Sequence, residues 1–342
     1  MDLSCPVPHQ PSQRVLLSHG GGARHSRDLL KQVILKHFGE QAGHHDGAYL
    51  PNPGGTLVMT TDSYVIQPLF FPGGNIGSLA VCGTLNDLAV CAARPLGLTV
   101  GFILEEGLDM DTLERIVIAM NEEAKRAGVS IVSGDTKVIE RGRGDGLFIN
   151  VSGVGQMMAA NPIVPENISE GDVVIVNGDI GRHGLTIMAT REGLDFETSL
   201  ESDSAAIWPE VEALLDSGVD LHCMRDLTRG GLGMAMYELS GACGQSIDLE
   251  SDSIPVHPGV SAICEVLGLD PLFSACEGRF AAMVPEDQAS KALAALEKAG
   301  ARPKIVGQVG GQTNGSNVVL RNALGVGHIL VPPSGEQLPR IC

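Results

Sequence analysis

The sequence has few aromatic residues, few basic residues and no long apolar run. Aromatic residues make up 4% of the 342 positions, and Trp208 is the single tryptophan. Lysine and arginine number 23 against 41 aspartates and glutamates, which gives a formal net charge of −18. Since so acidic a chain repels nucleic-acid phosphates, we expect no sequence-independent DNA or RNA binding. No run of about 18 apolar residues exists, so we expect no membrane span.

The common signals for export, zinc and nucleotide loops are also missing. The first 14 residues lack the apolar core of a secretory signal, so we expect a cytoplasmic protein whose eight cysteines remain thiols. None of these cysteines forms a C-x-x-C pair, which argues against a zinc knuckle or a thioredoxin-like motif. Neither the Walker pattern nor a Rossmann G-x-G-x-x-G fingerprint occurs.

The length and the alternation of elements predict two domains. Apolar residues make up 43% of the chain, enough for substantial cores. Strands and helices alternate in both halves, and several strands are close in sequence, which favours an α+β fold with mixed sheets. We expect an N-terminal arm at 1–17, a first domain at 18–158, a second at 168–325 and a mobile tail at 326–342.

Four aspartates of the first half stand at positions suited to a hard cation. Asp46 lies in a loop, Asp62 near the end of a strand over 57–61, and Asp135 after a strand over 129–133 and a glycine. Asp87 lies in an otherwise apolar helix, where an unpaired charge is costly. Converging carboxylates could hold Mg²⁺. The alternatives are ordinary turn or capping aspartates, and a solvent-exposed helix face for Asp87.

Two glycine clusters each precede a predicted helix. The first is Gly20, Gly21 and Gly22, and the second follows Arg225 in the run RDLTRGG. Main-chain N–H groups at a helix start can bind phosphate oxygens. The alternative for either cluster is a tight turn.

The chain ends in a cysteine, Cys342, after a segment rich in glycine and proline. Thirteen extended residues reach roughly 40 Å, enough to bring the last residue into a distant pocket. An ionised thiol is a nucleophile. The alternative is an exposed cysteine without a role.

Together these motifs resemble the HypE family of hydrogenase maturation proteins. That family belongs to the superfamily of aminoimidazole ribonucleotide synthetase, selenophosphate synthetase and thiamine-monophosphate kinase. The likeness runs from about Leu16 to Cys342. It rests on HGGG at 19–22, TD at 61–62, ND at 86–87, GDT at 134–136, GRHG at 181–184, RDLTRGG at 225–231 and the terminal PRIC.

The resemblance implies a two-domain fold, a homodimer and two cofactors. The first halves of two chains would pair into a shared β-barrel, and ATP would lie in the cleft between the domains. Mg²⁺ would be held by Asp46, Asp62, Asp87 and Asp135. Nucleotide contacts would come from Gly20, Gly21, Gly22, Asp62, Thr136, Asp226, Thr228, Arg229 and Gly230.

The resemblance also implies an activity and partners. HypF would place a carbamoyl group on Cys342, and this chain would dehydrate the thiocarboxamide to a thiocyanate at the expense of ATP. The cyano group would pass to iron on the HypC–HypD complex, for a nickel–iron hydrogenase. Lys137 and Glu277 are the candidate bases. The role of His183 stays open among metal ligand, phosphate contact and structural residue.

Two other functions are compatible with the sequence. A selenophosphate synthetase-like phosphotransferase would need a reactive cysteine beside a lysine near the start, whereas Cys5 is flanked by Ser4 and Pro6. A thiol shuttle, in which ATP only moves the tail, needs no catalysis. Phosphoryl transfer coupled to a change at Cys342 would exclude the shuttle.

Overall fold

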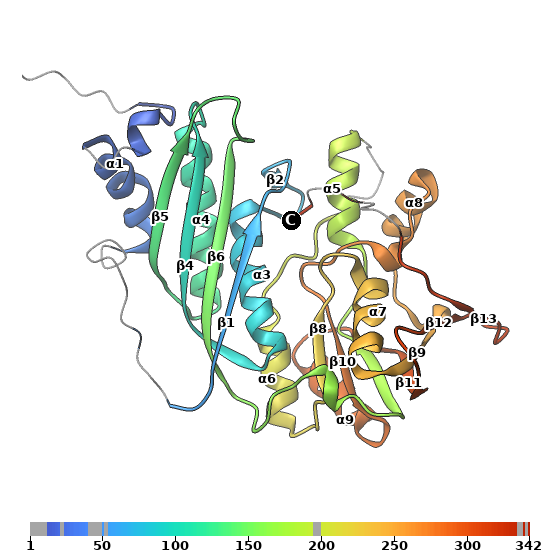
Figure 1. Ribbon diagram of the computed structural model, residues 1–342. Helices are drawn as coiled ribbons and strands as arrows, with labels where there is room; N and C mark the ends of the chain where they lie inside the picture. Colours follow the sequence, from blue (N-terminus) through green and yellow to red (C-terminus); the bar gives the residue numbers. More distant parts are fainter. Residues whose placement is uncertain are drawn as a thin grey trace, which may run out of the picture.

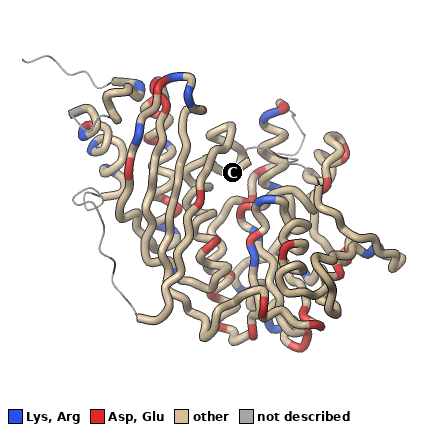
Figure 2. Tube along the Cα trace, viewed as in Figure 1, with Lys and Arg blue, Asp and Glu red and all other residues tan. Residues whose placement is uncertain are grey.

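A computed structural model describes residues 12–20, 24–39, 50, 54–193, 200–333, 338 and 341–342. Among the predicted site residues, Gly21, Gly22 and Asp46 lie outside this range. Within it, no helix is long and apolar enough to cross a membrane. Acidic positions are spread over both halves of the molecule (Figure 2).

The first half is built on a four-stranded sheet in the order β1-β6-β4-β5. Its strands are β1 (Leu57–Tyr64), β4 (Ala93–Glu105), β5 (Ile131–Ile139) and β6 (Leu147–Met157). Neighbouring strands are antiparallel except β4 and β5, which are parallel. The remaining elements are η1 (Leu17–Gly20), α1 (Arg24–Leu29), η2 (Leu30–Ile34), α2 (Leu35–Phe38), the hairpin β2 (Phe70–Phe71) and β3 (Gly74–Asn75), α3 (Ile76–Val90) and α4 (Met110–Arg126).

Helices α3 and α4 pack against each other on one face of this sheet (Figure 1). In α4 the Asp109 carboxylate caps the helix start by accepting a hydrogen bond from the Thr112 amide. Its apolar residues recur at helical spacing, so α4 buries one stripe and leaves the rest in solvent. Nearly every residue of α3 is buried, because the second half covers the side that faces away from the sheet.

The second half is built on a seven-stranded sheet in the order β13-β12-β9-β11-β7-β10-β8. Its neighbours are antiparallel except the parallel pair β9 and β12. The strands are β7 (Asp172–Val176), β8 (Cys223–Asp226), β9 (Gln245–Glu250), β10 (Phe280–Pro285), β11 (Lys304–Gln312), β12 (Val318–Arg321) and β13 (Gly327–Ile329). The α-helices are α5 (Arg182–Glu192), α6 (Trp208–Ser217), α7 (Gly231–Cys243), α8 (Pro258–Leu267) and α9 (Ala289–Lys298). Short 3-10 turns, η4 (Pro165–Asn167), η5 (Ser251–Ser253), η6 (Pro271–Phe273) and η7 (Glu286–Gln288), connect them.

Helices cover both faces of the central strands of this sheet. Val173 and Ile175 of β7 belong to one core with residues of α6 and α9, whereas Val174 and Val176 belong to another core with residues of α7. Successive residues of a strand point to opposite faces. The continuous apolar run of β7 therefore reflects burial on both sides.

The α+β class with mixed sheets is confirmed, and two local expectations need correction. Asp135 does not follow a strand: β5 continues to Ile139 because it pairs with β4 over its whole length. The segment predicted as a tail from residue 326 begins with β13, which pairs with β12 at the sheet edge. An unpaired edge offers main-chain hydrogen bonds to any neighbouring segment, and hydrophobic periodicity does not predict such pairing.

Candidate functional site

A cavity of about 800 Å³ lies where the two halves meet. Each half contributes polar side chains to its wall. The C-terminus lies between the halves, beside β2 and α5 (Figure 1). Eight of the sequence-predicted site residues line this cavity: Asp62, Asp87, Asp226, Thr228, Arg229, Gly230, Glu277 and Cys342. Residues far apart in the sequence thus share one wall.

The carboxylates of the cavity repel one another. Burial, with the charges of Asp226 and Asp62, raises the pKa of Asp87 to about 6, although a 2.6 Å hydrogen bond from Thr60 Oγ1 lowers it. Burial also raises the pKa of Asp226, against the opposing charge of Arg225. Oxygen ligands with excess negative charge suit a hard divalent cation.

No three His, Cys, Asp or Glu side chains of the described part of the chain stand close enough to form a complete metal site. Mg²⁺ usually shares a few carboxylates with waters and substrate phosphates, so an open acidic wall fits it better than a closed cage. Asp62, Asp87 and Asp226 form such a wall.

Helix α7 begins at the cavity, as the glycine pair predicted. Gly230 and Gly231 have φ values of 76° and 59°, in the left-handed region that favours glycine. A Cβ on Gly231 would lie 2.5 Å from the carbonyl oxygen of Ser274. Glycine is therefore required where β8 turns into α7, with Thr228 and Arg229 facing the cavity just before.

Glu277 is buried at the cavity wall, with 2% of its surface exposed. Its Oε1 has no hydrogen-bond partner among the described residues. Burial first, and then the charges of Asp203 and Asp226, raises the pKa of Glu277 well above its ordinary value. A carboxyl group in such surroundings is a candidate for proton transfer.

Asn86 of α3 fixes the main chain around Glu277. Its amide nitrogen donates hydrogen bonds of 2.9 Å to the carbonyl oxygens of Glu277 and Ala205, and its Oδ1 accepts one of 3.0 Å from the Ile207 amide. The sequence marked Asn86 only as the neighbour of Asp87. Its function as the link between the two halves needed the fold.

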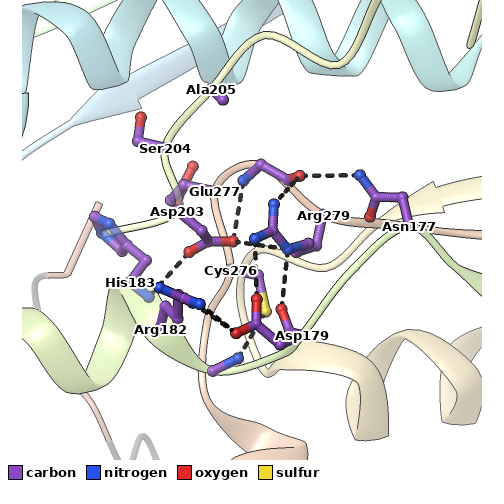
Figure 3. Close-up of polar contacts among 12 residues, drawn as sticks. Asn177, Asp179, Arg182, His183, Asp203, Ser204, Ala205, Cys276, Glu277 and Arg279 are labelled. Carbon is purple, nitrogen blue, oxygen red and sulfur yellow. Dashed lines mark hydrogen bonds and ion pairs between the residues drawn. The ribbon is translucent and has the colours of Figure 1, made fainter. Parts of the chain in front are cut away.

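A second support of the Glu277 segment is Asp203, which sequence reasoning missed. Its carboxylate accepts a 3.3 Å hydrogen bond from the Gly278 amide and lies 3.8 Å from Arg279 Nε (Figure 3). Arg279 also pairs with Asp179 at 3.0 Å, and Asp179 pairs with Arg182. Asp203 lies in a polar run, ESDS, which has no distinguishing pattern.

The end of the chain is docked beside these groups. Cys342 is half-buried and lines the cavity. Its main-chain oxygen accepts a 3.1 Å hydrogen bond from the Val65 amide, directly after β1. Leu338 and Ile341 are each 5% exposed and belong to a core that contains residues of both halves, among them Leu185 of α5. The tail thus enters the cavity of its own chain.

The other predicted site residues lie elsewhere. Asp135, Thr136 and Lys137 are on β5, at the opposite edge of the sheet from β1, and Gly20 packs against Val138 of the same strand. The Lys137 and Asp135 side chains are 67% and 70% exposed and pair at 3.2 Å. The described residues that line the cavity do not include them. We call this second group the β5 cluster.

Comparisons with known proteins find relatives for both halves of the chain. Residues 44–157 match the family model of the AIR synthase related protein N-terminal domain, and residues 169–319 match that of the C-terminal domain. The carbamoyl dehydratase HypE of Rhodobacter capsulatus is 45% identical over 96% of this chain and 98% of its own length. The one from Escherichia coli K12 is 42% identical, with coverage of 96% and 99%.

Solved structures give the same result. The crystal structure of hydrogenase maturation protein HypE in complex with ATP has a TM-score of 0.91 and 41% identity, covering 96% of this chain and 99% of its own. The HypE of the HypE–HypF complex has a TM-score of 0.79 and 38% identity, covering 89% and 99%.

Proposed function

Because the chain belongs to the HypE family of carbamoyl dehydratases, we propose that it dehydrates a carbamoyl group carried on its own Cys342, with ATP as co-substrate. One observation carries this proposal: Cys342 is docked in the cavity that holds the buried Glu277 and the acidic wall. A group attached to the thiol would lie among residues suited to proton transfer and to phosphate chemistry.

The thiocarboxamide of Cys342 reacts with ATP to give the thiocyanate, ADP, phosphate and a proton. The carbonyl oxygen leaves with the phosphate, and the nitrogen loses both protons while the carbon–nitrogen bond becomes triple. One of the two protons ends on the phosphate, and the other is released to solvent. Glu277 is the proton acceptor that the cavity itself offers, because a carboxylate whose pKa is raised by burial is a stronger base than an exposed one.

Mg²⁺ is part of the proposal. Asp62, Asp87 and Asp226 would hold it from the cavity wall, with Asp46 and Asp135 as further candidates from the resemblance. When bound, the metal neutralises phosphate charge and orients the phosphates. Thr228, Arg229 and Gly230 would contact the nucleotide where α7 begins.

We further propose that the active unit is a homodimer. The β5 cluster and the cavity lie at opposite edges of one sheet, so a single chain does not join them. Leu57, Met59 and Ile103 leave apolar side chains exposed on this sheet, as an interface would require. In a symmetric pair, Lys137 of the partner subunit would reach the cavity of the first.

The partners are also proposals. One relative has been solved as a complex with HypF, which supports HypF as the carbamoyl donor here. The HypC–HypD complex is proposed as the acceptor of the cyano group, in the cytoplasm. Both exchanges require the docked tail to leave the cavity and return.

Brief treatment with cyanate, which carbamoylates thiols, gives a direct test. The carbamoylated protein is incubated with ATP and Mg²⁺, and the tail peptide is weighed. Loss of one water from that peptide, with ADP and phosphate appearing, is expected, and C342A should show neither. Carbamoylated Cys342 that keeps its mass while ATP is bound would favour the thiol shuttle instead. ATP turnover independent of Cys342 would favour another phosphotransferase.

A further inference from the structure

The docked tail makes a second contact one residue before Cys342. Nε2 of His183, the second residue of α5, lies 2.5 Å from the main-chain oxygen of Ile341. A carbonyl oxygen only accepts hydrogen bonds, so Nε2 carries the hydrogen and donates it. His183 is completely buried, and its ring meets that of Phe71 edge-on at 5.4 Å.

A short hydrogen-bonded chain accompanies this tautomer of His183. Burial lowers the pKa of His183, which favours the neutral ring. A neutral ring with its hydrogen on Nε2 leaves Nδ1 as an acceptor, so the Ser202 hydroxyl, 2.8 Å away, donates to it. The Ser204 amide in turn donates to Ser202 Oγ at 3.1 Å. Each hydrogen bond in this series is donated in the direction of the tail.

Asp203 joins His183 to the segment that carries Glu277. One oxygen of its carboxylate accepts a 3.0 Å hydrogen bond from the His183 amide, and the other accepts from the Gly278 amide (Figure 3). His183, which contacts the tail, and Gly278, which follows Glu277, thus both donate to the buried carboxylate of Asp203.

The tail is gripped from both halves of the molecule. Val65, after β1, donates to the oxygen of Cys342, and His183, on α5, donates to the oxygen of Ile341. Two consecutive carbonyl groups fixed in this way determine the main-chain direction at Cys342, so that mainly the rotation of its side chain remains.

We infer that His183 is a positioning residue that holds the tail in its docked state through the Ile341 carbonyl and so places Cys342 in the cavity that Glu277 lines. The inference deepens the proposed function and rests on it for the dehydration readout only. His183 hydrogen-bonds through its ring to Ser202 and to the main chain of Ile341. Its contribution is to raise the fraction of molecules in which the tail is docked and to orient the thiol.

Two substitutions separate the donor from the bulk of the side chain. In H183Q the amide nitrogen reaches the position of Nε2 and keeps the donor, whereas the shorter side chain of H183N falls short of the Ile341 oxygen. N-ethylmaleimide alkylation of Cys342 is followed without ATP, on the peptide that glutamyl endopeptidase releases after Glu336. Cys82, only 1% exposed, reports on folding in the same sample.

We expect H183N to speed the alkylation of Cys342 about tenfold, the factor for one lost buried hydrogen bond, with Cys82 still protected. Dehydration of the carbamoylated tail should slow by a similar factor, and H183Q should restore both rates. Equal Cys342 alkylation in all three proteins would overturn the inference. If Cys82 in H183N reacts, H183F, which keeps a ring but has no donor, is used instead, and unchanged Cys342 alkylation there has the same meaning.

The two proposals fail separately in this experiment. Should the wild-type protein dehydrate nothing, the proposed function is wrong, while the alkylation rates still report on tail docking. Should dehydration proceed at the wild-type rate in H183N, the function stands and the positioning role of His183 is wrong.

Discussion

The main-chain oxygen of Cys342 accepts a 3.1 Å hydrogen bond from the amide of Val65. This bond ties the last residue of the chain to the end of β1, the strand that carries Asp62. Cys342 and Asp62 are therefore attached to the same strand. The buried side chains of Leu338 and Ile341 add apolar contact to this arrangement. The docked tail thus packs against residues of both halves.

Removing the last three residues, 340–342, should abolish dehydration and leave ATP binding within about twofold, because the nucleotide contacts lie on other elements. ATP binding is measured by calorimetry. Dehydration is measured as the loss of one water from the carbamoylated tail peptide, whose reactive cysteine the truncated protein lacks. C91A is the matched control, since Cys91 is an exposed thiol at the same cavity. Loss of dehydration in C91A would mean that Cys91, and not Cys342, carries the carbamoyl group.

The E277Q variant should accept carbamoylation normally and slow the dehydration step by about 100-fold or more, the usual effect of losing a general base. Glutamine keeps the size of the side chain but takes up no proton. E210Q is the control, because Glu210 is another acid whose pKa burial raises, yet it bonds Asn177 and does not line the cavity. Comparable slowing in both variants would mean that Glu277 has a structural role and is not the base.

D87N should stabilise the protein in the absence of Mg²⁺ and ATP by about 1–2 kcal/mol at pH 7. The pKa of Asp87 is raised to about 6, so the native state binds this proton more tightly than the unfolded chain. Stability contributed by this residue is therefore highest below about pH 4 and falls as pH rises toward 6. Urea unfolding at several pH values measures the difference.

The same titration predicts weaker Mg²⁺ binding at pH 5 than at pH 7.5, since the ion competes with the proton on Asp87. D216N, at an exposed position of α6, should change neither stability nor its pH dependence. A D87N protein that is less stable than wild type at pH 7 would mean that other groups in the fold stabilise the charged Asp87 carboxylate.

Mixing two inactive variants tests the proposed homodimer. K137A and E277Q should each lose dehydration when pure. If Lys137 reaches the cavity of the partner subunit, a mixed dimer contains one intact site, and random mixing restores about a quarter of the wild-type sites. Equilibrated mixtures are assayed by water loss from the tail peptide. A mixture as inactive as its components would show that Lys137 and Glu277 act within one chain or not at all.

The sequence was informative where a local rule had a single outcome. The glycine pair at 230 and 231 predicted the start of α7, which begins at Gly231. Asp87 stood out because a charge among apolar neighbours needs a reason, and it does line the cavity. The sequence predicts the terminal cysteine as the reactive group, which stays a prediction, whereas its docking in the same chain was not predicted.

Other features depend on contacts between distant segments. β5 runs through Asp135 because β4 lies beside it, and no pattern within 131–139 reports that neighbour. Asp203 and His183 belong to polar runs that turns also contain, and their roles arise from the Gly278 amide and the Ile341 carbonyl. The separation of Lys137 from Glu277 likewise follows from strand order, which hydrophobic periodicity does not encode.

The most direct measurement follows the carbonyl oxygen. Cys342 is carbamoylated with ¹⁸O-labelled cyanate, and the protein is incubated with ATP and Mg²⁺ in ordinary water. The account predicts one ¹⁸O in the released phosphate for each tail converted to thiocyanate, because the oxygen leaves bonded to phosphorus. Label in the solvent with unlabelled phosphate, or label that stays on the tail while ATP is consumed, would contradict it.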